Sequence, residues 1–320
     1  MLKAVILAAG QGTRMKSKLP KVVHKVMGKC MVEHAIHAAR QAGADEICVV
    51  VGHGAETVKS EIFSMEQPSG ITFVTQEQQL GTGHAVRCAR EFIGTEGETL
   101  ILFGDTPLIT GATLKKLVCT HRAEGNSITV LSAVLDNPAG YGRIIRDADG
   151  VFSKSVEHKD ATEEERQCRE INSGMYVFES ASLYEALDLL KNDNAQGEYY
   201  LPDTLMIIRD KGLKVDAMVV DDATEIEGVN SRVQLAAAEK IMKLRINRAW
   251  MEAGVTIIDP ETTYIGPDVR IENDVVIYPD TFITGNTVIK ADSVIGPFSY
   301  LQNAVVDEGS ELLPYTKLIG

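Results

Sequence analysis

The sequence predicts an α/β domain built on a parallel sheet, followed by a short parallel β-helix. Three observations carry this prediction: short apolar runs alternate with helical stretches, a glycine-rich turn follows the first run, and aliphatic residues recur every six positions near the C-terminus. Strand–helix alternation is typical of βαβ units, whose helices cover both faces of the sheet. A six-residue period is typical of β-helices, in which short strands stack into coils.

The first part of the chain supplies the alternating elements. From about Ser127 the alternation loosens into strands and loops, which usually carry substrate specificity in such a fold. The expected strands are residues 4–7, 47–51, 71–74 and 100–103, and the expected helices are residues 31–41, 55–63 and 82–92.

The C-terminal part is an internal repeat of about three coils. A helix from about Ser231 to Met251 joins it to the first part, so we expect domains at residues 1–229 and 253–320 with a linker helix at 230–252. The repeat predicts one inward aliphatic per strand, with one break at Asp307. The predicted inward residues are Ile265, Ile271, Ile277, Ile283, Ile289, Ile295, Leu301, Leu313 and Ile319, and small or β-branched residues follow four positions later at Val269, Val275, Thr281, Thr287, Ser293, Ser299 and Val305.

Composition excludes several classes of protein. The 320 residues carry a net charge of −13, which argues against a nucleic-acid partner. No run approaches the roughly 18 apolar residues of a membrane span, and the N-terminus lacks the features of a signal peptide, so we expect a cytoplasmic protein without a membrane partner. The five cysteines are odd in number and form no CxxC pair, which favours reduced thiols over a disulfide framework or a zinc site.

A glycine-rich turn follows the first apolar run, in the stretch Leu7-Ala8-Ala9-Gly10-Gln11-Gly12-Thr13-Arg14-Met15. Ligands bind at the carboxyl ends of strands in open α/β sheets. Gly10 and Gly12 let the backbone approach a phosphate chain, and Arg14 and Lys21 add positive charge. A dinucleotide fingerprint would need a third glycine at Met15, and a P-loop would need Gly-Lys-Ser/Thr, which is absent. The turn therefore predicts a triphosphate-binding loop.

The charge pattern around this turn supports the same interpretation. The first 32 residues contain seven basic residues and no acid before Glu33, although the whole chain is acidic. A basic run alone is more often a solvated face. Beside a glycine turn that follows a buried strand, an anion site becomes the better interpretation. The seven residues are Lys3, Arg14, Lys16, Lys18, Lys21, Lys25 and Lys29.

The motif from Leu7 to Val22, with Pro20-Lys21 at its end, closely resembles the signature of bacterial UDP-N-acetylglucosamine pyrophosphorylases. These form the uridylyltransferase half of a bifunctional enzyme of cell-wall precursor synthesis. The resemblance implies a Rossmann-like nucleotidyltransferase domain, and the repeat resembles the left-handed β-helix of hexapeptide-repeat acyltransferases. Further blocks that are similar to the family, in its order, are Gln76, Gln79 to Ala85, Gly104 to Leu108, Gly140 to Arg143, Glu157 to Ala161, Glu170 to Gly174, Gly197 to Tyr200 and Glu227 to Asn230.

Asp105 follows the apolar run 100–103 through Gly104, which places its carboxylate at the same sheet edge as the glycine loop. By itself, an acid before Thr-Pro is equally well a turn former. The family resemblance implies that Asp105 is a Mg²⁺ ligand and that Asn230 is the second, although an Asn ahead of a helix is more often only a cap. Magnesium takes few protein oxygens together with waters and phosphates, so one carboxylate and one amide suffice.

The same resemblance assigns two groups of binding residues and a catalytic set, Arg14, Lys21 and Asp105. Without the resemblance, Glu157 and Asn172 are better interpreted as polar surface residues. The implied nucleotide-binding residues are Leu7, Ala8, Ala9, Gly10, Gly12, Gln76, Gly81 and Thr82, and the implied sugar-binding residues are Gly140, Glu157, Asn172, Tyr200 and Asn230. Two departures from some relatives are Phe103, which lacks a hydroxyl before Gly-Asp, and Pro202 after Tyr-Tyr.

The implied reaction is UTP plus N-acetylglucosamine 1-phosphate giving UDP-N-acetylglucosamine and pyrophosphate. Because a phosphate's second pKa is about 6, the acceptor is already ionised and needs no side-chain base. The alternatives are a bifunctional enzyme that also acetylates glucosamine 1-phosphate and a scaffold that binds sugar nucleotides without turnover. By family resemblance we expect a homotrimer formed through the β-helix. In the bifunctional relatives that this chain resembles, the acetyltransferase site lies in later coils and uses a histidine base. No histidine follows His158, so we expect no acetyl transfer by this polypeptide.

Overall fold

The computed structural model describes residues 1–65, 67–194 and 196–320. It divides into two compact units, Met1–His24 with Cys30–Ser231, and Lys25–Lys29 with Arg232–Gly320. The domain boundaries drawn from the sequence stay a prediction. Within the described ranges, no helix is both long enough and apolar enough to cross a bilayer.

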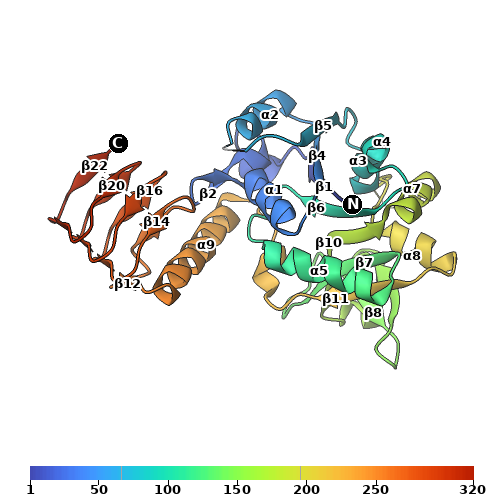
Figure 1. Cartoon of the computed structure of the whole chain (residues 1–320). Helices are drawn as coiled ribbons and strands as arrows, with labels where there is room; N and C mark the ends of the chain where they lie inside the picture. Colours follow the sequence, from blue (N-terminus) through green and yellow to red (C-terminus); the bar gives the residue numbers. More distant parts are fainter. Residues whose placement is uncertain (66, 195) are drawn as a thin grey trace. The chain divides into compact units, whose positions relative to one another are not determined.

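The first unit is built on a nine-stranded sheet, counted over the described residues, whose main path runs β11-β7-β10-β6-β1-β4-β5 (Figure 1). The hairpin β8–β9 lies off this path and pairs through β8 with β10. The strands are β1 (Leu2–Ala8), β4 (Glu46–Val51), β5 (Ile71–Thr75), β6 (Glu98–Phe103), β7 (Ile128–Val134), β8 (Gly142–Arg146), β9 (Phe152–Val156), β10 (Glu170–Glu179) and β11 (Val215–Val219).

The predicted parallel pairing is confirmed for the four expected strands, although the whole sheet is mixed. The four strands expected from the sequence are β1, β4, β5 and β6, and they do pair in parallel. In contrast, β10 runs antiparallel to both β6 and β7. β8 is antiparallel to both β9 and β10, so β9 and β10 run in the same direction, opposite to β6 and β7.

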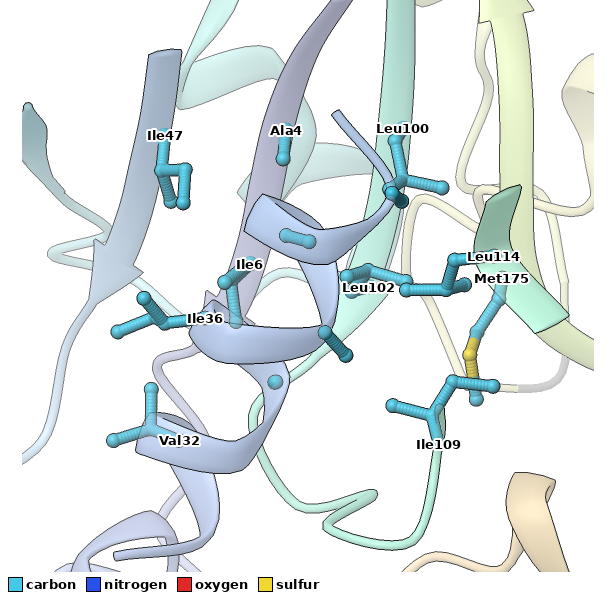
Figure 2. Packing of buried hydrophobic residues seen from close by; sticks show 14 of the residues in the cluster. Ala4, Ile6, Val32, Ile36, Ile47, Leu100, Leu102, Ile109, Leu114 and Met175 are labelled. Atoms are coloured by element: carbon cyan, nitrogen blue, oxygen red, sulfur yellow. The ribbon is translucent and has the colours of Figure 1, made fainter. Parts of the chain in front are cut away.

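Helices cover both faces of this sheet, as the strand–helix alternation predicts. Alternate residues of β1 belong to different cores: Ala4 and Ile6 pack with α1 and α5, whereas Val5 and Leu7 pack with α3, α7 and α8. Figure 2 shows the first of these cores, with Ile36 of α1 over β1. The helices are α1 (Met31–Gln41), α2 (Ala55–Phe63), α3 (Thr82–Cys88), α4 (Arg90–Ile93), α5 (Gly111–Glu124), α6 (Glu163–Arg166), α7 (Ser180–Leu189) and α8 (Asp203–Asp210).

The helices expected at residues 31–41 and 55–63 are confirmed as α1 and α2. The single helix expected at residues 82–92 is wrong, because the chain there forms α3 and α4 with a break at Ala89. Ala89 has a ψ of 8°, outside the helical range, and both it and Ile93 are buried in the same core. Short elements complete the description: η1 (Thr13–Met15), η2 (Lys21–Val23), η3 (Ala223–Ile226), β2 (Lys25–Val26) and β3 (Lys29–Cys30).

The second unit contains α9 (Arg232–Glu252) and three stacks of short parallel strands, β12-β15-β18-β21, β13-β16-β19-β22 and β14-β17-β20. This is the predicted left-handed parallel β-helix. Asn247 of α9 donates to the Pro260 and Thr263 carbonyls at 2.9 and 2.8 Å, which ties the helix to the first coil. The strands are β12 (Thr256–Ile257), β13 (Tyr264–Ile265), β14 (Arg270–Ile271), β15 (Val276–Ile277), β16 (Phe282–Thr284), β17 (Val288–Ile289), β18 (Val294–Ile295), β19 (Tyr300–Gln302), β20 (Val305–Val306), β21 (Glu311–Leu312) and β22 (Lys317–Ile319).

The predicted inward aliphatics from Ile265 to Leu301 are buried in the β-helix core. The small residues four positions later have a physical role, since the Thr287 hydroxyl donates to the Thr284 carbonyl at 2.7 Å and Ser299 does the same to Gly296 at 2.6 Å. These bonds satisfy backbone carbonyls at the buried corners of the coil.

The phase predicted after Leu301 is wrong by one residue. Val306 pairs with Ile289, so only five positions separate it from Leu301. Leu312 and Leu318 therefore pack against the core, while the residues predicted to do so point outward. Leu313 is 70% exposed, Ile319 is 59% exposed, and Ala304 replaces Val305 as the buried small residue.

Candidate active site

The glycine loop lies at the carboxyl end of β1, as expected. Gly12 has a φ of +63°, and a Cβ there would come 2.5 Å from the Lys21 Cβ. Glycine at this position thus satisfies both the left-handed backbone and the close passage of the lysine stem. Arg14 follows on η1 with an exposed side chain. The structure brings Lys21 into the site and leaves Arg14 on the rim of the loop.

Asp105 and Asn230 converge on Lys21 at the same carboxyl edge of the sheet as the glycine loop. Asp105 follows β6, and the Val229 amide donates to the Asp105 carbonyl at 2.8 Å, which brings Asn230 alongside. The Lys21 ammonium forms an ion pair with the Asp105 carboxylate and donates to Asn230 Oδ1 at 2.9 Å. A cationic group is therefore already held between the carboxylate oxygen and the amide oxygen.

This donor pair fits a hard divalent cation. In the described part of the chain, no cluster of three or more His, Cys, Asp or Glu side chains could hold a metal ion. A site made of one carboxylate and one amide oxygen suits an ion that keeps most of its coordination for water and substrate phosphates. The position now taken by the Lys21 ammonium marks where positive charge is stabilised.

A pocket beside the loop gathers all but one of the predicted nucleotide-binding residues. Lys21 and Asp105 lie in its wall, so the cationic centre opens into it. The exception is Gly12, whose role is in the loop backbone described above. The residues that line the pocket are Leu7, Ala8, Ala9, Gly10, Lys21, Val22, Gln76, Gln79, Gly81, Thr82, Ala85, Phe103, Asp105 and Glu198.

A second pocket adjoins the first, and Thr82, Phe103 and Glu198 line both. Four of the five predicted sugar-binding residues line this second pocket: Gly140, Glu157, Asn172 and Tyr200. The fifth, Asn230, instead contacts Lys21 beside the first pocket.

Hydrogen bonds fix the Asn172 side chain in the second pocket. Its Oδ1 accepts from the Gly174 amide at 2.8 Å and from the Tyr176 hydroxyl at 3.1 Å, and its Nδ2 donates to Ser155. Tyr200 donates its hydroxyl to Gln196 at 2.7 Å. Asn172 is thus held in one orientation.

Carboxyl groups crowd the same pocket. Burial raises the pKa of Glu157, and the nearby Asp203 and Asp160 carboxylates raise it further. Burial also raises the pKa of Asp203, with a further contribution from Asp160. Within the described ranges the Glu157 side chain has no hydrogen-bonded or ionic partner, so its oxygens face the pocket available for a polar ligand.

Sequence reasoning missed several lining residues. Phe103 packs its ring where a Cβ on Gly174 would lie, and it forms part of the wall shared by both pockets. Gln79 donates from Nε2 to the Ala9 carbonyl at 2.7 Å. For Tyr141, burial is the main cause of a raised pKa, followed by Glu227 and Asp105. Each lies in or beside a recognised motif, and that proximity was the available signal.

A phosphate-binding loop, a cationic centre and two adjoining pockets at the carboxyl edge of the sheet define a nucleotidyltransferase. Residues 4–197 match the family model of the MobA-like NTP transferase domain. The chain is 55% identical over 312 residues to the bifunctional protein GlmU of Caldanaerobacter subterraneus subsp. tengcongensis, which covers 98% of this chain and 67% of that protein. It is 49% identical over 332 residues to the bifunctional protein GlmU of Shouchella clausii, covering 98% and 72% of the two chains.

The chain therefore belongs to the GlmU family. Its activity is that of a nucleotidyltransferase, the synthesis of UDP-N-acetylglucosamine by uridylyl transfer. The substrates are a nucleotide and a sugar phosphate, and enzymes of this class use a divalent metal ion.

Proposed function

We propose that the two adjoining pockets perform Mg²⁺-dependent transfer of UMP from UTP to N-acetylglucosamine 1-phosphate. The observation that carries this proposal is the Lys21–Asp105–Asn230 centre, which opens into a pocket beside the glycine loop. The second pocket shares a wall with the first, so an acceptor bound there would face the phosphates. Alignment and charge neutralisation then supply the catalysis.

The nucleotide would lie with its base toward Gln76 and Gly81 and its phosphates toward Gly10 and Lys21. Backbone N–H groups of the loop suit phosphate oxygens, and Gln76 is 95% buried in the wall of the pocket. The remaining residues assigned to the nucleotide are Leu7, Ala8, Ala9, Gly12 and Thr82.

Asp105 and Asn230 would hold Mg²⁺, which would neutralise charge on the triphosphate and the leaving pyrophosphate. Lys21 would then release these two oxygens and turn its ammonium to the phosphates, a short movement for a flexible side chain. Arg14, exposed on η1, would close on the leaving pyrophosphate as a second cation.

The acceptor sugar would bind in the second pocket among Gly140, Glu157, Asn172 and Tyr200. Glu157 and Asn172 carry the discrimination, because the Glu157 oxygens and the second Nδ2 hydrogen of Asn172 would be left unpaired beneath a sugar that lacks matching groups. The phosphate of the acceptor would then point to the wall shared by the two pockets.

We further propose a cytoplasmic homotrimer formed through the β-helix. Exposed aromatic side chains on the coils support association with further copies of this chain, since Phe282 and Tyr300 are 42% and 37% exposed on adjacent coils. Light scattering tests this part separately, because a homotrimer would have three times the mass of one chain in solution.

The catalytic proposal is tested by measuring pyrophosphate release with UTP and a panel of sugar 1-phosphates. We expect activity with N-acetylglucosamine 1-phosphate and Mg²⁺, and none after chelation of the metal. Equal efficiency with glucose 1-phosphate would contradict the sugar-site assignment.

A further inference from the structure

One side chain behind the nucleotide pocket has no role in the mechanism above. His84 is the third residue of α3, and its Nδ1 lies 3.0 Å from the Nε2 of Gln76. The same Nε2 donates to the Gly81 carbonyl at 3.1 Å. Both hydrogens of the Gln76 amide nitrogen are thus engaged by atoms behind the pocket wall.

The Gly81 carbonyl fixes which end of the Gln76 amide faces it. A carbonyl oxygen only accepts hydrogen bonds, so the nitrogen of Gln76 must face it and the oxygen must not. Gly81 itself is held firmly, because the Tyr199 amide donates to the Leu80 carbonyl and the Gly83 amide donates to the Tyr199 carbonyl, each at 2.8 Å. A Cβ at position 81 would lie 2.6 Å from the Tyr199 carbonyl oxygen.

His84 must then present a lone pair at Nδ1. An imidazole protonated there would oppose one N–H with another, so the neutral ring carries its hydrogen on Nε2. Burial lowers the pKa of His84, Arg87 lowers it further, and a hydrogen bond to the Gln78 backbone acts in the opposite direction. The neutral ring is therefore the prevailing form at neutral pH.

The consequence lies on the pocket side of Gln76. Its Oε1 accepts no hydrogen bond from any residue in the described ranges, and the side chain lines the nucleotide pocket. The pocket is therefore offered an acceptor and no donor at this point. Uracil presents an N–H donor at N3, whereas cytosine presents an acceptor there.

We propose that His84 is a positioning residue that locks the Gln76 amide with its oxygen toward the base and so selects uracil over cytosine. This rests on the proposed function, in which Gln76 meets the base. To accept cytosine, Gln76 would have to turn its oxygen toward two acceptors, the Gly81 carbonyl and His84 Nδ1. Such a flip leaves unpaired acceptors facing each other, which is the kind of penalty that gives a binding site its specificity.

The test compares two replacements of similar size. In His84→Asn, Oδ1 occupies nearly the position of Nδ1 and keeps an acceptor there, whereas His84→Leu is the apolar counterpart. Dissociation constants of UTP and CTP are measured by calorimetry with Mg²⁺ and without sugar phosphate. We expect the UTP-over-CTP preference to fall about tenfold in His84→Leu, the size of one hydrogen bond, and to stay within about twofold in His84→Asn.

A matched control is His121→Ala. His121 is a buried histidine of the same unit, its Nδ1 lies 3.0 Å from the Thr129 hydroxyl, and it lines neither of the two pockets. This variant should lose stability and keep the base preference. The long-range ¹⁵N spectrum of the parent protein should show His84 unprotonated at Nδ1, a readout that needs no variant to fold.

The inference is overturned if His84→Leu keeps the parent preference, if both variants lose UTP and CTP affinity in parallel, or if Nδ1 is protonated. Pyrophosphate release by the parent is measured alongside. If the parent releases no pyrophosphate, the proposed function is overturned. If the parent turns over UTP but the His84→Leu variant still rejects CTP, only the role of His84 is overturned.

Discussion

Replacing Asp105 by asparagine should lower kcat by on the order of 10² or more. The substitution keeps the shape of the side chain and removes a carboxylate that forms an ion pair with Lys21. The Lys21 and Asp105 side chains are only 14% and 15% exposed, so their charges are less screened than those of a surface pair. A factor of 100 corresponds to about 2.7 kcal/mol of barrier, which is typical for loss of one main electrostatic element.

The assay is steady-state pyrophosphate release across a Mg²⁺ titration, with thermal unfolding measured to show that the variant is folded. The double variant Asp105→Asn with Asn230→Asp is the matched control. It moves the carboxylate to the other side of Lys21, where Asn230 Oδ1 now lies 2.9 Å from Nζ, and keeps one carboxylate and one amide. We expect kcat of the double variant to be at least about tenfold higher than that of Asp105→Asn. Near-normal activity of Asp105→Asn at low Mg²⁺ would refute the assignment of the metal site.

Three further predictions test other parts of the structure. Arg14→Ala should lower kcat more than it raises KM for UTP, because its charge is most useful as the pyrophosphate leaves; steady-state kinetics with a changed KM and unchanged kcat would contradict this. Glu157 has a raised pKa in the folded chain, so its contribution to stability is lost as pH rises from 4.5 through that folded pKa. Glu157→Gln should therefore raise Tm at about pH 8 and leave it nearly unchanged at about pH 4, and calorimetry showing the larger gain at the acidic pH would reverse the sign. Leu301→Ala, at a fully buried position, should cost about 2–5 kcal/mol in denaturant unfolding, against under about 0.5 kcal/mol for Leu313→Ala, which is 70% exposed; equal costs would contradict the observed phase.

The β-helix shows how far a period in the sequence can predict a structure. Each inward aliphatic from Ile265 to Leu301 was predictable because every coil repeats the same three corners. The corner between Leu301 and Val306 is one residue shorter, and the sequence contains a plausible aliphatic at both phases beyond it. Leu312 and Leu313 are adjacent and equally apolar, so only the pairing of β21 with β18 distinguishes them.

The mixed sheet illustrates a different limit. Apolar runs predicted β1, β4, β5 and β6 because each run is followed by a helical stretch, and β1, β4 and β6 are buried on both faces. The direction of β10 was not encoded in its own residues, since a doubly buried strand has the same apolar pattern in either direction. The sequence between residues 127 and 170 gave only a loosened pattern, from which the antiparallel pairing of β10 with β6, β7 and β8 could not be predicted.

The positions of active-site residues could be predicted where a residue lies in a single recognisable motif. The orientation of a side chain that contacts residues of another segment could not. Gly10, Lys21 and Asp105 each follow a strand at the same sheet edge, so position along the chain was enough to bring them together. Gln76 was predicted as a nucleotide-binding residue, yet its sequence position does not say which end of the amide faces the pocket. That orientation depends on the Gly81 carbonyl and on His84 Nδ1, whose tautomer in turn depends on the bond it accepts. The choice between uracil, which is a donor at N3, and cytosine, which is an acceptor there, therefore depends on the groups that hold the Gln76 amide, and only the folded arrangement of the segment from Gln76 to His84 makes it visible.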